Sequence, residues 1–128
     1  MALEFEISTI ILRPPQEVYE AWLDSKQHSK MTGAKARVSA KVGDAFDAWD
    51  GYITGKNLTL EPGKRIVQAW RTSEFADDEE DSQIDVRLEP VEAGTKLILR
   101  HTKLPPHGDI YRQGWVDSYF IPMKEYFE

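Results

Sequence analysis

The chain ends in DIYRQGWVDSYFIPMKEYFE, residues 109–128, and this stretch decides the fold. Its large apolar side chains recur at intervals of three, four and seven residues, in two rows. The first row is Trp115, Tyr119 and Tyr126, and the second is Val116, Phe120, Met123 and Phe127. These intervals place side chains on one stripe of an α-helix, whereas the side chains of a strand alternate every second residue. A stripe so rich in aromatic rings has to be buried, so we expect a long C-terminal helix packed across a sheet.

Pro122 interrupts this stretch. A proline inside a helix removes one backbone hydrogen bond, here to the carbonyl of Ser118, and costs about 3 kcal/mol. Because Met123, Tyr126 and Phe127 continue the apolar pattern beyond it, we expect a kinked helix rather than a broken one.

The residues upstream of the helix have the pattern of strands and tight turns. Residues 3–12 alternate apolar and polar side chains, as in a strand with one wet face. Two prolines end that strand, and two short helices are predicted after it, over residues 16–23 and from Ser25, as the N-cap, to Gly33.

From Ala36 onward the pattern is that of successive hairpins, with one strand beginning at Val38 and a two-residue turn at Asp50-Gly51. The predicted fold is a single α+β domain over residues 1–128. It has a curved antiparallel sheet of about seven strands, two short helices after the first strand and a long C-terminal helix across the sheet.

Composition and charge exclude several classes of function. The net charge is −6, and 16 basic residues are scattered among 22 acidic ones, so we expect no nucleic-acid partner. No apolar run approaches the ~20 residues of a membrane span, and the N-terminus lacks the pattern of a signal peptide. The absence of cysteine excludes disulfides and thiolate chemistry and favours the cytoplasm. His101 and His107 have no third ligand nearby in the sequence, so we expect no metal and no cofactor.

No catalytic motif is present, and we assign no catalytic residue. A sheet that curls around a helix tends to enclose a cavity, and alternation along the strands predicts the wall of that cavity. The predicted wall is Phe46, Ala48, Trp70, Val86, Leu99, Trp115 and Tyr119, with Gln68 and His101 as polar groups. The alternative is that the aromatic rings form an ordinary core and that the two polar side chains are tied to a buried hydroxyl or carbonyl. A register shift of one residue would exchange inside and outside.

Several motifs resemble those of a known family. They are GDAF at residues 43–46, WDGYITG at 49–55, LEPGKRIVQAWR at 60–71, GTKL at 94–97, HTKLP at 101–105, and the helix from GW at 114–115 to YF at 126–127. The chain resembles the C-terminal domain of the activator of the ninety-kilodalton heat-shock protein ATPase. This resemblance implies a helix-grip fold of the START and birch-pollen-allergen kind, in which a sheet wraps a long helix around an apolar cavity.

Three functions are consistent with these observations. The leading hypothesis is a non-enzymatic module that binds a small apolar or amphipathic ligand between the sheet and the helix. The alternative, which the resemblance implies, is a co-chaperone-like protein that modulates a heat-shock chaperone of the ninety-kilodalton type. The third is an enzyme in the same cavity, which would need a titratable group in a desolvated site, and His101 is the one inward candidate.

Overall fold

The computed structural model describes residues 3–127 as one antiparallel sheet with helices on one face. The strands are β1 (Leu3–Ile11), β2 (Ala45–Ala48), β3 (Ile53–Glu61), β4 (Arg65–Thr72), β5 (Ser82–Val91) and β6 (Gly94–Leu104), in the spatial order β1-β6-β5-β4-β3-β2. The helices are α1 (Pro15–Trp22), α2 (Ser25–Thr32), a 3₁₀ turn η1 (Pro106–Asp109), and then α3 (Ile110–Trp115), a π-helical turn η2 (Val116–Phe120) and α4 (Ile121–Tyr126).

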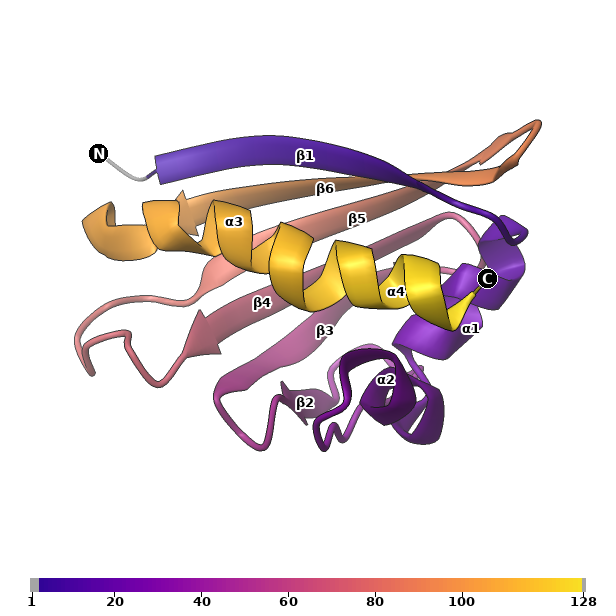
Figure 1. Ribbon diagram of the computed structural model, residues 1–128. Helices are drawn as coiled ribbons and strands as arrows, with labels where there is room; N and C mark the ends of the chain where they lie inside the picture. The colour runs from indigo at the N-terminus through magenta and orange to yellow at the C-terminus, as the bar shows by residue number, and fades with distance from the viewer. Residues whose placement is uncertain (1–2, 128) are drawn as a thin grey trace.

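Figure 1 shows α3, η2 and α4 running on as one long helix across the sheet, with α1 and α2 near its C-terminal end. This arrangement confirms the predicted α+β class, the two short helices after β1 and the long terminal helix. None of the helices described in residues 3–127 is both long enough and apolar enough to cross a membrane.

The predicted seventh strand is wrong. The segment from Val38 makes no ladder, and its neighbour Arg37 forms a single bridge with Asp47. The reason is that side chains, rather than a neighbouring strand, form the hydrogen bonds to the backbone of this segment. The Ser25 hydroxyl accepts from the Val38 N–H and donates to the Val38 carbonyl, at 2.9 and 3.1 Å. Further along, the Asn57 side-chain amide donates to two carbonyls of the same segment, at 2.8 and 2.9 Å.

The predicted N-cap of α2 is also displaced by one residue. Asp24 is the cap, and its carboxylate accepts from the Gln27 N–H at 2.9 Å. Ser25 is instead the first helical residue, which leaves its hydroxyl free for Val38. The predicted end of this helix at Gly33 is confirmed. Gly33 is the C-cap and adopts φ +81°, a left-handed conformation that favours glycine.

The C-terminal helix adapts to Pro122 through the π-helical turn. Just ahead of the proline, the Ile121 N–H bonds to the Val116 carbonyl, five residues back instead of four. The wider turn holds one extra residue, and it therefore moves the buried stripe by one position. The side chains buried against the sheet are Tyr111, Trp115 and Tyr119 before this point, and Phe120, Met123 and Phe127 after it. Each of the two predicted rows thus supplies one part of a single buried face, and Val116 and Tyr126, which lie in the other part of their rows, are only partly buried.

Candidate functional site

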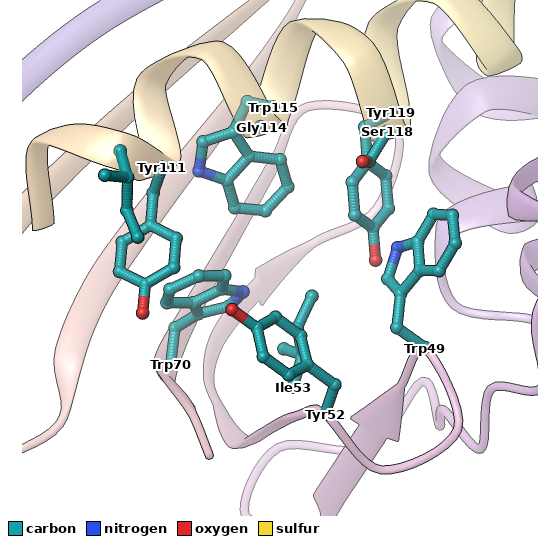
Figure 2. Close-up of a pocket in the computed structure, with 10 residues that line it drawn as sticks. Trp49, Tyr52, Ile53, Trp70, Tyr111, Gly114, Trp115, Ser118 and Tyr119 are labelled. Carbon is teal, nitrogen blue, oxygen red and sulfur yellow. The ribbon is translucent and has the colours of Figure 1, made fainter. Parts of the chain in front are cut away.

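A cavity of about 330 Å³ lies between the C-terminal helix and the hairpin that joins β2 to β3 (Figure 2). This volume is at the small end of the range for ligand pockets in proteins, and the lining is mostly aromatic. The lining residues are Trp49, Tyr52 and Ile53 from the hairpin, Trp70 from β4, and Ile110, Tyr111, Gly114, Trp115, Ser118 and Tyr119 from the helix. None of them carries a charged side chain.

The hairpin loop delivers Trp49 and Tyr52 to the pocket. Three successive residues, Trp49, Asp50 and Gly51, have φ of +54°, +56° and +89°. Because Ala48 pairs with Ile53, the turn has four residues rather than the two predicted from Asp50-Gly51. The segment after α2 anchors it, since the Lys35 carbonyl accepts from the Asp50 N–H at 3.0 Å and the Lys35 N–H donates to the Asp50 carboxylate at 3.2 Å.

The helix side of the pocket is a ladder of rings four residues apart. Trp70 packs against the first two rungs, with ring centroids 5.0 Å from Tyr111 and 5.5 Å from Trp115. Trp115 in turn lies 4.8 Å from Tyr119. Gly114 lies in the neighbouring row of the helix, between Ile110 and Ser118, and a Cβ added there would meet no atom within 4 Å. The absence of a side chain at Gly114 therefore keeps this part of the wall open.

The rim of the pocket is partly exposed. Ile110 is 59% and Tyr52 38% accessible to solvent. The Tyr52 hydroxyl donates to the Glu74 carboxylate, and both this contact and burial raise the pKa of Tyr52. At the same end the Tyr111 and Thr72 hydroxyls are hydrogen-bonded at 2.6 Å. The hydroxyl groups at the rim are therefore already paired within the protein.

The deep end of the pocket holds a buried tyrosine–histidine pair. His28 Nδ1 lies 2.8 Å from the Trp22 carbonyl, and His28 Nε2 lies 2.8 Å from the Tyr119 hydroxyl. A carbonyl can only accept, so Nδ1 carries the proton, and Nε2 accepts from Tyr119. Burial lowers the pKa of His28 and raises the pKa of Tyr119, so both groups stay neutral. The Tyr119 hydroxyl proton is committed to His28, so toward the cavity the Tyr119 oxygen can act only as an acceptor.

His101 lies outside the pocket, in the layer between the sheet and the helix. Trp115 Nε1 donates to His101 Nδ1 at 3.0 Å, and His101 Nε2 lies 2.8 Å from the Ser82 hydroxyl, which itself donates to the Trp70 carbonyl. The tautomer is therefore the one protonated at Nε2. Burial lowers the pKa of His101 to about 3. With both nitrogens engaged, the ring ties the helix to the sheet and has none left for a ligand or a reaction.

The structure brings only part of the predicted wall to the pocket. Trp70, Trp115 and Tyr119 line it. The other predicted positions are buried in the core: Phe46, Ala48, Gln68, Val86, Leu99 and His101. Gln68 accepts from the Trp22 indole at 3.4 Å and donates to Asn57 at 2.8 Å. Phe46 lies over Gly55, where an added Cβ would come within 2.7 Å of its ring.

Sequence reasoning missed the hairpin loop and the start of the helix as parts of the site. Two signals pointed to them. The first is that Tyr111 precedes Trp115 by four residues and so belongs to the same helical stripe. The second is that two large aromatic residues, Trp49 and Tyr52, flank the turn at Asp50-Gly51 and need a surface to pack against. What the sequence did not contain is the position of that turn opposite the helix.

Comparison with known proteins places this site in a context. Residues 13–128 match the family described as "Activator of Hsp90 ATPase homolog 1-like protein". The human Activator of 90 kDa heat shock protein ATPase homolog 1 is 28% identical over 117 residues, which are 91% of this chain and 34% of the human protein. The chain thus spans about a third of the length of the curated relatives it matches along most of its residues.

Solved structures share the fold. An HSP90 activator from Plasmodium falciparum superposes with a TM-score of 0.81 at 23% identity, covering 98% of this chain and 94% of that chain. The Aha1 dimer from Colwellia psychrerythraea gives a TM-score of 0.78 at 18% identity, covering 100% and 96%. At these identities the likeness shows the fold alone, and that fold is the helix-grip arrangement implied by the sequence motifs.

Proposed function

The chain belongs to the family of Activator of Hsp90 ATPase homolog 1-like proteins, and from that starting point we propose that it binds a small apolar ligand in the pocket between the C-terminal helix and the β2–β3 hairpin. The observation that carries the proposal is an uncharged cavity of about 330 Å³ walled by six aromatic rings. Close-packed protein interiors rarely leave such a space, and aromatic walls of this kind suit a flat or apolar molecule.

We propose binding without chemical conversion. The two buried histidines of the domain, His28 and His101, both use both ring nitrogens within the protein. A general base needs a nitrogen or carboxylate within reach of a substrate proton, and no ionisable carboxylate or amine lines the pocket. The enzymatic hypothesis based on His101 therefore loses its candidate residue.

A leucine at position 114 is expected to block the pocket while leaving the fold intact. A Cβ added there meets no atom within 4 Å, so the rest of a leucine side chain has room to extend into the pocket, and leucine favours a helix over glycine by roughly 0.8 kcal/mol. Titration calorimetry with 2-naphthol should show saturable binding to the parent and an affinity at least about tenfold weaker for Gly114→Leu, with an unchanged or raised melting temperature.

Gln113→Leu is the matched control. It adds the same side chain one residue away, at an exposed position outside the pocket, and should bind the probe like the parent. Equal binding by Gly114→Leu and the parent would place the probe elsewhere and remove the pocket from the proposal.

A second function is favoured by the family match and by the name of the human relative, an activator of the ATPase of the 90 kDa heat-shock protein. We propose that the domain contacts a chaperone of that type. In a coupled assay with the chaperone of the same organism, the folded domain should raise the rate of ATP hydrolysis, whereas heat-unfolded domain should not. An unchanged rate at saturating domain would contradict activation, and a binding measurement would then decide whether contact alone remains.

A further inference from the structure

Trp49 has an unpaired polar atom at the wall of the pocket. Within residues 3–127, its indole Nε1 is the one buried side-chain nitrogen or oxygen without a hydrogen-bond partner. Buried polar groups in folded proteins are nearly always hydrogen-bonded, because an unpaired group loses its hydrogen bonds to water on burial and gains none in return. An unpaired donor at the wall of a cavity is available to a group that enters the cavity.

The backbone of Trp49 is also unusual. Its φ of +54° lies in the left-handed region, which a bulky side chain seldom adopts. The following turn and the hydrogen bonds between Lys35 and Asp50 hold it there. Conformations of this kind gather at binding and active sites. Figure 2 shows the nitrogen edge of the Trp49 indole turned toward Tyr119.

An unused acceptor lies beside this unused donor. Figure 2 shows the Trp49 nitrogen and the Tyr119 hydroxyl facing the same space. Burial raises the pKa of Tyr119, and hydrogen bonding from the Trp49 side chain lowers it in smaller part, so the two polar atoms are neighbours. Their geometry nevertheless falls short of an aligned hydrogen bond. Because Tyr119 gives its proton to His28, its oxygen presents lone pairs to the cavity.

We propose that Trp49 Nε1–H and the Tyr119 oxygen together recognise a hydroxyl group on a neutral, planar aromatic ligand; this inference rests on the proposed binding function. A hydroxyl is the smallest group that accepts one hydrogen bond and donates another, so it satisfies both atoms at once. The remaining walls, Trp70 and Trp115 above all, offer ring faces and edges for stacking.

The same geometry excludes other ligand heads. A carboxylate would enter a lining without any cation and would face the Tyr119 lone pairs, so its loss of hydration is not compensated. An ammonium group has no lone pair, so it would leave the Trp49 N–H unpaired. A hydrocarbon leaves both atoms unpaired. The pocket is therefore selective for the hydroxyl among molecules of the same ring system.

The test compares 2-naphthol, naphthalene and 2-naphthoate by titration calorimetry. The parent should bind 2-naphthol at least about tenfold more tightly than naphthalene, and 2-naphthoate more weakly than either. Trp49→Phe keeps an aromatic ring and removes the N–H, so it should reduce the preference for naphthol over naphthalene to less than about threefold while leaving naphthalene affinity nearly unchanged. Tyr52→Phe removes a hydroxyl from the rim and should leave the preference intact.

A second measurement covers the case in which Trp49→Phe does not fold. In the labelled parent protein, the indole N–H resonance of Trp49 should move downfield on addition of 2-naphthol, as a new hydrogen bond requires, and should show no downfield shift with naphthalene, whose ring current alone acts on it. Equal affinities for naphthol and naphthalene, or a static Trp49 resonance at saturation, would overturn the recognition of a hydroxyl while leaving pocket binding standing. Absence of binding by all three probes would instead overturn the proposed function itself.

Discussion

Replacing Trp115 by alanine is expected to lower the free energy of unfolding by about 3–5 kcal/mol, a third or more of the stability of an ordinary domain. The side chain is 3% exposed, packs on Trp70 and Tyr119, and stacks on Trp22 with ring centroids 6.2 Å apart. Its loss also leaves His101 Nδ1 without a donor in a buried layer. Denaturant unfolding of the two proteins measures the difference.

Two comparisons make this result interpretable. Ser118→Ala changes a half-buried neighbour on the same helix and the same pocket, and should cost less than about 0.5 kcal/mol. Because Trp115 also borders the cavity, 2-naphthol should restore part of the lost stability by mass action if it binds the enlarged space. A Trp115→Ala protein that melts like the parent would contradict the tie between the helix and the sheet.

Acid is expected to weaken the domain through His101. The pKa of His101 is about 3 in the folded state, against 6.5 for an ordinary histidine. Between these two pH values His101 is protonated in the unfolded chain and neutral in the folded protein. The contribution of neutral His101 to the free energy of unfolding is therefore fully present above pH 6.5. It is lost as the pH falls toward 3, by roughly 1.4 kcal/mol per pH unit. The loss at pH 5 should be about 2 kcal/mol from this residue.

The structural reason is that protonation would place an N–H on His101 Nδ1, directly against the Trp115 N–H that now donates to it. The side chains around the ring, Phe5, Trp70, Tyr111 and Ser82, carry no charge that could stabilise an imidazolium.

The measurement is denaturant unfolding between pH 7.5 and pH 5. His101→Gln should remove about 2 kcal/mol of the change over this range, and what remains includes His28, whose pKa burial also lowers. An identical pH dependence in His101→Gln and the parent would contradict the buried neutral histidine.

Local patterns in the sequence predicted most of the fold. The change from a two-residue to a 3.6-residue period after residue 108 identified a terminal helix on a sheet, and tight-turn residues separated the strands. The error at Val38 came from side chains, Ser25 and Asn57, that replace a strand partner for its backbone. Such bonds join residues 13 and more positions apart, and no local pattern records them.

By itself, the sequence determined the class of the fold, the face of the helix that is buried and the inward direction of His101, because these depend on periodicity within a single element. Only the tertiary structure decided where the pocket lies. Val86 and Leu99, predicted for the wall of the cavity, are fully buried and do not line the pocket. The opening lies instead where the hairpin at Trp49 meets Tyr119, 70 residues later in the chain, and that meeting depends on the curvature of the whole sheet.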